Sequence, residues 1–479
     1  MTKLHLSRTV VRPVSVMAAA IWLAGCAITA QHAPLPAPDA RALQQVTGSV
    51  AAQATETRNG DRWWQDFSDP QLAALVNQAL ANNHDLSATA LRLEAELARL
   101  QVSRDQRRPQ GGVSGSLEMS RQQGSSGLEV SRQERAAAGL AAEWQLDLFG
   151  RISARIRQAQ ASVENQQALR AQSLADVVSG VVDTYIRLMG TEEQLTLLNK
   201  QLQLLNQSVS VLQLRVDEGL STPLELSRTQ ALLFEYRARK PDLDVLRTQY
   251  QEALATLTGQ TLTELQAGVQ IPQLYPEQAL QLQIREPERA LRQAPEVRLA
   301  EARVADAVAL SDEAQASLYP DISVSGVLGW LSASSLNLTD AREQIAIQPR
   351  LNWSLFNLSA LRANLEARSL EEQAVVAEYE QTWLNLLNRA DGAILDWQAY
   401  QVRLAELEQR QAYARDAYEQ ARSRYEEGII PYLDYLDAQR DLLNSEADLV
   451  TARTRKLEAY TRLQRVFSGT WVSGLTADA

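Results

Sequence analysis

Two aspartates in the last fifth of the chain have the spacing that most suggests chemistry. Asp434 and Asp437 lie three positions apart in a predicted helix, so their carboxylates share one helix face. Carboxylates crowded together repel one another, which raises their pKa and attracts cations. The alternative is structural, because helix capping and the helix macrodipole favour aspartate in a first turn. That alternative applies most directly to Asp434, since Asp437 lies further into the helix.

The single cysteine of the chain, Cys26, ends a predicted secretion signal. A basic segment precedes a short apolar core over residues 14–23. Leu23-Ala24-Gly25-Cys26 then resembles a bacterial lipobox, in which the cysteine becomes the acylated first residue of the mature protein. The alternative is a plain signal peptide with a cysteine there by coincidence. A lone cysteine excludes an internal disulfide framework. By the same resemblance, Ala27 in place of aspartate predicts sorting to the outer membrane.

Catalytic chemistry has little support elsewhere in the chain. The three histidines, His5, His32 and His84, fall in the signal, in the segment after it and at a helix start, so neither a catalytic triad nor a metal cluster is expected. The sequence contains no glycine loop for a nucleotide. A net charge of −11 argues against nucleic acid, whose phosphates need a basic face. We therefore predict no enzymatic activity and no metal or other cofactor.

Four short segments alternate apolar and polar residues, which indicates strands wetted on one side only. They cover 112–120 and 138–149 in the first half of the chain, and 322–325 and 345–355 in the second. Four strands cannot close a membrane barrel, which needs about eight. If the apolar sides face lipid, several chains must pool their strands.

The alternation assigns residues to each side of the predicted sheet. The apolar side includes Leu140, Leu146, Ile322, Ile347 and Leu351. Trp144, Trp330 and Trp353 are expected at a lipid–water boundary. The alternative, a soluble sandwich core, conflicts with a polar side formed by Glu143, Gln145, Asp147, Arg350 and Asn352. Pro349 deletes a ladder hydrogen bond, so we expect it at a bulge or near the rim.

The chain carries one arrangement twice. In each half a helix, two strands, a long helix, a glycine turn and a further helix follow one another. Residues 151–218 lack proline and would span about 100 Å as a straight helix, and 224–258 return as a second helix. Pro109 matches Pro320, and Gly219 matches Gly428, at offsets near 210 residues. Such repeats predict a pseudo-symmetric assembly.

The predicted organisation has six segments. They are a lipoprotein signal peptide over 1–25, an acylated and extended tether over 26–68, a first repeat over 69–260, a linker over 261–287, a second repeat over 288–468 and a tail over 469–479. Residues 121–135 are polar and include glycine and serine, so we expect an exposed loop between the first two strands.

Several motifs, in order along the chain, resemble those of the TolC family of outer-membrane channels, and of its lipoprotein efflux branch of OprM-type and NodT-type proteins. Residues 64–70, Trp-Gln-Asp-Phe-Ser-Asp-Pro, are similar to the opening block of that branch. Residues 144–151 and 348–356 resemble the run in which a strand becomes a long helix. Residues 425–428 resemble the periplasmic tip. Ser354 and residues 357–359 depart from the family pattern at the second of these bends.

The resemblance implies a mostly helical fold with a small membrane barrel. Three chains would contribute four strands each to a twelve-stranded β-barrel, standing on a twelve-helix α-barrel that crosses the periplasm. Asp434 and Asp437 would each form a ring of three carboxylates that narrows the duct. Leu433 would act as an apolar plug and Arg440 as a tie across helices. Tyr425 would hold the closed state, while Ile430 replaces an arginine that locks some relatives.

The resemblance also implies partners. Gly219, Leu220, Gly428 and Ile429, in the two turns, would contact a periplasmic adaptor protein, although both are also ordinary helical hairpin turns. The predicted function is a passive homotrimeric duct in the outer membrane of a Gram-negative bacterium, anchored by a covalent lipid on Cys26. It would carry drugs or other small molecules from an adaptor and an inner-membrane resistance–nodulation–division pump. The alternative is a lipid-anchored periplasmic coiled-coil protein without a pore, and an envelope hydrolase comes third.

Overall fold

A computed structural model describes residues 32, 34–37, 40–51, 60–123, 130–268, 284, 286–332 and 342–477. The chain divides into two compact units. The first comprises residues up to Pro36, Arg92–Gln166 and Leu299–Glu380, and it contains all four strands. The second comprises Ala37–Leu91, Gln167–Arg298 and Gln381–Ala479, and it is helical where the structure describes regular elements.

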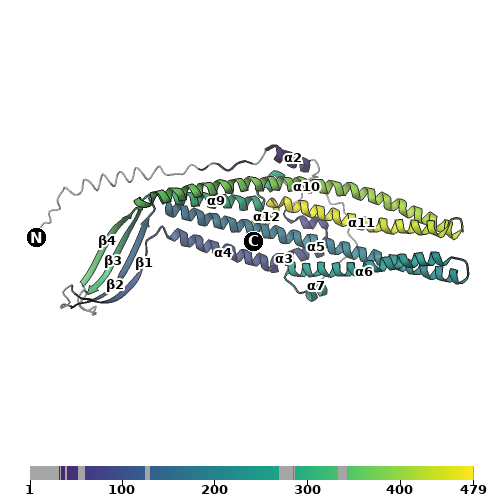
Figure 1. Cartoon of the computed structure of the whole chain (residues 1–479), viewed down its shortest axis with the longest axis horizontal. Coiled ribbons are helices and arrows are strands. Elements are labelled where there is room, and N and C mark those ends of the chain that lie inside the picture. Colours follow the sequence, from purple (N-terminus) through teal and green to yellow (C-terminus); the bar gives the residue numbers. More distant parts are fainter. Residues whose placement is uncertain are drawn as a thin grey trace. The chain divides into compact units, whose positions relative to one another are not determined.

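The predicted repeat is confirmed in the order of the elements (Figure 1). The first copy consists of α3 (Pro70–Asn82), α4 (His84–Asp105), β1 (Gln110–Gln123), β2 (Val130–Leu146), α5 (Arg151–Asp217) and α6 (Pro223–Thr258). The second consists of α8 (Pro287–Arg292), α9 (Pro295–Ala316), β3 (Asp321–Ser332), β4 (Arg342–Asn352), α10 (Leu358–Glu426) and α11 (Tyr432–Val466). A short 3-10 turn, η3 (Leu355–Asn357), joins β4 to α10.

Helix α3 begins, and helix α5 ends, where the sequence predicts. Asp69 caps α3, because its side chain accepts hydrogen bonds from the amides of Gln71 and Leu72 at 2.8 and 3.2 Å. Helix α5 covers the proline-free segment and ends at Asp217. No described helix is both long enough and apolar enough to cross a membrane.

The four strands form one antiparallel sheet in the order β1-β2-β3-β4 (Figure 1). The hairpin of β1 and β2 is longer than predicted, since its ladder continues to the pair Gln123 and Val130. The expected loop over 121–135 is therefore wrong at both ends, and residues 124–129 lie outside the described part. Residues 120–123 and 131–135 are polar on both faces of the hairpin, so they show no apolar–polar alternation. They still pair, because backbone hydrogen bonds do not require an apolar face.

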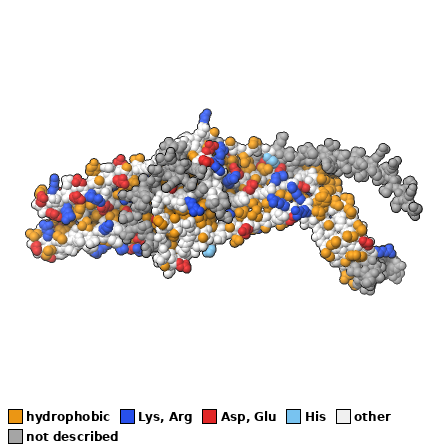
Figure 2. Space-filling model, turned by 180° about the vertical axis from the view of Figure 1, so that it is seen from behind, with side chains coloured by type: hydrophobic (Ala, Val, Ile, Leu, Met, Phe, Trp, Pro, Cys, Tyr) orange, Lys and Arg blue, Asp and Glu red, His pale blue; other side chains and the backbone are white. Residues whose placement is uncertain are grey.

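The register places the predicted apolar residues on one face. Leu146 pairs with Ile322, and Ile322 pairs with Leu351, so the three side chains share a face. Leu140 and Ile347 lie on that same face by the period of two. Hydrophobic side chains gather over the sheet in Figure 2. The predicted assignment of the apolar face is confirmed.

Pro349 lies inside an uninterrupted ladder, where it pairs with Val324. The predicted bulge is therefore absent, and the residue lies three positions before the end of β4 at Asn352. β4 is an outer strand of this sheet, which is where a residue without an amide proton is tolerated.

The expected extended conformation of the N-terminal segment is wrong over residues 40–51 and 60–67, whereas residue 32 and residues 34–37 form no helix or strand. Residues Ala40–Ala51 form helix α2, and Gly60–Phe67 form a 3-10 element, η1. Trp63, Trp64 and Phe67 of η1 are buried. They contact Tyr460 of α11 and Trp471, with ring centroids 5.7 to 6.4 Å apart. These aromatic partners come from the far end of the chain, so local sequence could not reveal the packing.

Two further helices were not expected. Residues Leu262–Gly268 form α7 in the predicted linker. Ser468–Ala477 form α12 in the predicted tail, where Trp471 and Val472 are buried. The indole of Trp471 donates a hydrogen bond to the carbonyl of Gln464 at 3.0 Å. The tail thus completes the aromatic core of the second unit.

Candidate functional site

The apolar face of the sheet is exposed within the chain. Val113, Leu140, Leu328 and Ile347 expose between 47% and 84% of their surface, far more than core residues of a soluble sheet. Every side chain of β4 except Ala346 is also exposed. Among the described residues these side chains have no covering layer, as is typical of a surface that binds a partner or lipid.

Tryptophans mark both ends of this face. The indoles of Trp144 and Trp353 donate hydrogen bonds to the carbonyls of Arg107 and Leu318 at 3.0 and 3.1 Å, which are matching positions of the two repeats. Trp144 pairs with Val324, six residues before Trp330 along β3. At about 3.3 Å per residue this separates the two tryptophans by roughly 20 Å, close to the height of a membrane apolar band.

The opposite face of the sheet is polar. Glu143 and Gln145 of β2 and Arg350 and Asn352 of β4 project to it together. The prediction that these four residues share one polar face is confirmed. The amide of Gln145 donates to Asp321 at 2.7 Å across the sheet.

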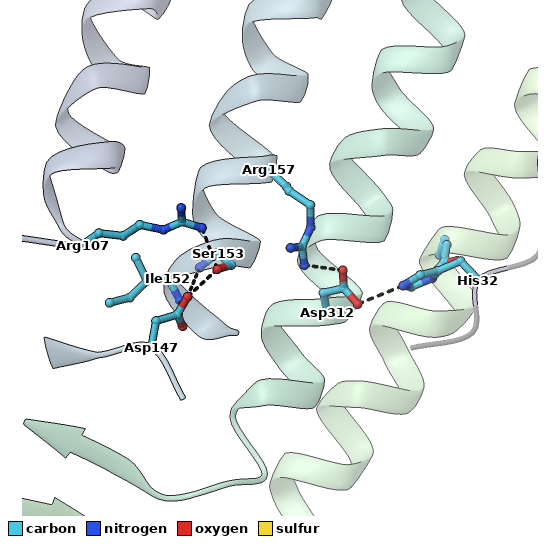
Figure 3. Close-up of polar contacts among 8 residues, drawn as sticks. His32, Arg107, Asp147, Ile152, Ser153, Arg157 and Asp312 are labelled. Carbon is cyan, nitrogen blue, oxygen red and sulfur yellow. Dashed lines mark hydrogen bonds and ion pairs between the residues drawn. The ribbon is translucent and has the colours of Figure 1, made fainter. Parts of the chain in front are cut away.

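Asp147 does not belong to that face, contrary to the prediction. It follows the end of β2 and caps α5, because its carboxylate accepts the amides of Ile152 and Ser153 at 2.9 and 2.8 Å (Figure 3). Arg107 donates to the hydroxyl of Ser153 at 2.8 Å and ties the end of α4 to the start of α5 (Figure 3). Asp147 therefore sets how the strand enters the long helix.

A group of tyrosines and one arginine holds the turn between α10 and α11. Arg215, in the last turn of α5, donates to the hydroxyl of Tyr425 at 3.1 Å and lies over its ring. The ring of Tyr425 stacks on Tyr435, with centroids 5.3 Å apart, and meets Tyr432 edge-on at 5.3 Å. Tyr418 lies 5.8 Å from Tyr435. We call these four tyrosines the tyrosine cluster.

The tyrosine cluster is joined to the hydrophobic core beside it. Tyr432 is buried, and its hydroxyl lies 2.6 Å from the hydroxyl of Thr229 in α6. Burial raises the pKa of Tyr432 to about 12, so the hydroxyl keeps its proton near neutral pH. Burial and the bond to Tyr418 also raise the pKa of Tyr435. Helices α5, α6, α10 and α11 therefore meet at this cluster through neutral phenols.

Apart from Tyr425, the predicted gate residues lie on the other side of α11. Leu433, Asp434, Asp437 and Arg440 are exposed, whereas Tyr432, Leu436 and Gln439 are buried against the chain. The first group is therefore presented away from the core of its own chain. Asp441, four residues after Asp437, extends the same exposed acidic face and was missed by the sequence argument.

Both glycine turns adopt the same backbone conformation. Gly219 and Gly428 have φ of 74° and 75°, in the left-handed region. The amides of Leu220 and Ile429 donate to the carbonyls of Arg215 and Arg424, five residues earlier, as in a Schellman ending. Leu220 and Ile429 expose 66% and 65% of their surfaces. The two turns thus offer matching apolar side chains to solvent.

Comparison of the whole chain with known proteins identifies its family. The family model described as outer membrane efflux protein matches residues 75–260 and 287–469. The chain belongs to the outer membrane efflux protein family. The predicted relation to TolC-type channels, the mostly helical fold with a small sheet, the role in efflux and the outer-membrane location are therefore confirmed.

Individual members of the outer membrane efflux protein family support the assignment. The outer-membrane channel OprN is 28% identical in structure-based comparison, with a TM-score of 0.84 over 93% of this chain and 99% of that one. The probable efflux pump outer membrane protein TtgC of Pseudomonas putida is 26% identical over 77% of each chain. The pyoverdine export outer membrane protein OpmQ of Pseudomonas aeruginosa is 26% identical over 82% of this chain and 85% of its own length.

Sequence reasoning found Tyr425 but not its partners. Arg215 and Thr229 belong to the first repeat, and Tyr432 and Tyr435 begin the last long helix. A signal was present, because Tyr418, Tyr425 and Tyr432 recur at intervals of seven residues. Cys26 lies outside the described residues, so its lipidation stays a prediction.

Proposed function

We propose that three copies of this chain assemble into one duct, with the four-stranded sheet of each copy completing a shared twelve-stranded barrel. The observation that carries the proposal is the sheet itself. β1 and β4 are its outer strands, and neither has a further strand partner among the described residues. A lone sheet with an exposed apolar face and two bare edges is not a stable membrane structure, because unpaired backbone groups are costly in lipid.

The faces of the sheet support the same arrangement. In a closed barrel the face of Leu140 and Ile347 would meet acyl chains, and the tryptophans would lie at the two headgroup regions. The face of Glu143 and Arg350 would line the aqueous interior. The chain would then act as a passive conduit without catalytic chemistry of its own.

The duct would receive cargo at the two glycine turns. Leu220 and Ile429 are exposed apolar residues at equivalent positions, and they suit a periplasmic adaptor with matching grooves. The adaptor would connect the duct to an inner-membrane pump of the resistance–nodulation–division type, which supplies the energy. Drugs or other small organic molecules are the proposed cargo, since relatives are named for efflux pumps and for pyoverdine export.

Acylation of Cys26 would add an anchor in the inner leaflet of the outer membrane. The sequence Leu-Ala-Gly-Cys supports it, and two signals, lipid and barrel, hold a protein more firmly than one. The mature chain would then begin six residues before His32.

Gating would take place at α11. Asp434 and Asp437 project away from their own chain, so three-fold assembly could bring three copies of each together at the axis. Crowded carboxylates would attract cations and narrow the passage. The tyrosine cluster, on the buried side of α11, would hold the narrow state.

Single-channel recording in planar bilayers tests the gate. Replacing both residues, Asp434→Ala with Asp437→Ala, should raise conductance severalfold and weaken the preference for cations. Asp242→Ala is the matched control, because Asp242 is an exposed aspartate of α6 remote from the glycine turns in sequence. Unchanged conductance in the double variant would remove both residues from the gate. The mass of the purified protein in detergent, corrected for bound detergent, should correspond to three chains.

A further inference from the structure

His32 connects the N-terminal segment of the chain to two helices of the first unit. Its Nε2 lies 2.9 Å from Asp312 of α9, and its Nδ1 lies 2.9 Å from Glu372 of α10. The second oxygen of Asp312 binds Arg157 of α5 at 2.6 Å. Figure 3 shows the imidazole directed toward Asp312, with Arg157 on the other side of that carboxylate. Four parts of the chain therefore meet at one histidine.

The two contacts of the ring require a particular protonation state. An ionised carboxylate accepts hydrogen bonds and donates none, and a neutral imidazole carries one N–H. Both ring nitrogens can therefore bond to carboxylates only when the ring is an imidazolium. With neutral His32, one nitrogen lone pair would face a carboxylate oxygen at 2.9 Å, which is repulsive.

The surrounding charges favour the imidazolium. Asp312 and Glu372 bring two negative charges, and Arg157 brings one positive charge, so a protonated ring makes the group neutral. The neighbouring charges, Arg155 with Glu313 and Arg368 with Glu371, are already paired at 2.7 and 2.8 Å. Burial lowers the pKa of His32, but the bonds and charges of the two carboxylates outweigh it, and the pKa is raised.

The site is partly sheltered and is not a metal centre. The side chains of His32, Asp312 and Glu372 expose 22%, 17% and 14% of their surface. The two carboxylates bind opposite nitrogens of one ring, so they do not converge on a common point. In keeping with this, the described residues contain no cluster suited to a metal ion.

We propose that His32 is a pH-dependent latch, which fastens the N-terminal segment that carries it to helices α9 and α10 when its ring is protonated. Below the pKa of free histidine the latch is closed and stabilises the docked segment in full. As pH rises through the raised pKa of the docked ring, the ring loses a proton and the stabilisation is lost. His32 lies six positions after Cys26, a stretch of chain that can span at most about 20 Å. The latch would therefore limit how far the N-terminus can move from these helices.

The proposal predicts the size of the pH effect. Between the pKa of free histidine, about 6.5, and the raised pKa in the latch, the ratio of docked to free segment falls about tenfold per pH unit. Residues 26–37 contain no histidine other than His32. The other described residues of this stretch, Pro34, Leu35, Pro36 and Ala37, do not titrate. A transition in this range can thus be assigned to His32.

Spin-label mobility in the full-length protein in detergent measures docking. Leu35→Cys carries the nitroxide, since Leu35 is 44% exposed and adjoins the latch. Protein without this substitution reports any labelling of Cys26. The label should be immobile near pH 6 and become mobile as pH rises. His32→Leu should give a mobile label throughout, and Glu372→Gln should shift the transition to lower pH.

His84→Leu is the matched control, because His84 is the other described histidine and lies exposed at the start of α4. It should titrate like the unmodified protein. Mobility that does not change with pH, or a His32→Leu variant that titrates as the wild type does, would overturn the latch. The measurement does not depend on a pore, so its outcome is independent of the proposed gate.

Discussion

The two glycine turns of this protein have the same backbone and different means of support. The helix that follows Gly219 begins with a capping box, in which Thr222 accepts the amide of Glu225 and Glu225 accepts the amide of Thr222. The helix that follows Gly428 begins at Tyr432, and its N-cap, Pro431, makes no side-chain capping bond. The first turn is stabilised by its own residues.

The second turn depends on residues from elsewhere. Tyr425 and Tyr432, on either side of it, are held by Arg215 and Thr229 of the first repeat. A turn fixed by its own cap moves with its helices as one piece. A turn fixed by tertiary contacts can be released when those contacts break. The comparison therefore predicts that the turn between α10 and α11 opens more readily than the turn between α5 and α6 when these contacts are removed.

The largest difference between the two turns is expected when Tyr432 is replaced. Tyr432→Ala removes a buried ring and its bond to Thr229, which should cost about 3–5 kcal/mol by analogy with other buried aromatic residues. Hydrogen exchange at the amides of residues 436–440, which are hydrogen-bonded within α11, would measure this as a lower free energy of local opening. The matched control is Leu220→Ala, at an exposed position of the first turn, which should change stability by less than about 0.5 kcal/mol. Equal effects at the two turns would contradict the comparison.

A smaller effect is expected for the hydrogen bond between Arg215 and Tyr425. Tyr425→Phe keeps the stacked ring and removes the hydroxyl that accepts from Arg215, at an expected cost of about 1.5 kcal/mol. A double-mutant cycle with Arg215→Leu isolates the pair, and non-additive opening free energies are expected. Tyr413→Phe, at a position 73% exposed, is the control. Strictly additive losses would show that Arg215 and Tyr425 do not act together.

The smallest effect is expected for the cap of the first turn. Thr222→Ala should destabilise the start of α6 by about 1 kcal/mol and leave exchange at α11 unchanged. Thr222→Ser retains the hydroxyl and should behave as the wild type. If the loss spread to residues 436–440, the two turns would be coupled, and the first could not be regarded as self-supporting.

Local sequence predicted what depends on period and on turn chemistry. Alternation placed Leu146, Ile322 and Leu351 on one face, and the register confirms it. Glycine followed by proline predicted the end of α5 and the start of α6. These features follow from backbone geometry at single positions, so one sequence is sufficient to find them.

What the sequence could not provide depends on distant partners. Trp63 and Trp64 were assigned to an extended tether, because the residues that bury them, Tyr460 and Trp471, lie about 400 positions later. Asp147 continued the alternation of β2, yet it caps α5 instead. An aspartate at a strand end followed by a helix fits both roles, and three-dimensional geometry decides between them.

The bare edges of the sheet have a genetic consequence. If each copy must pair with a strand of both neighbours, normal copies cannot replace a defective strand of another copy in the same assembly. A chain with a proline in the middle of β1 would be built into mixed assemblies and leave a gap in every one it enters. Such an allele should act dominantly over a normal one in the same cell, whereas a chain that fails to fold at all should be recessive.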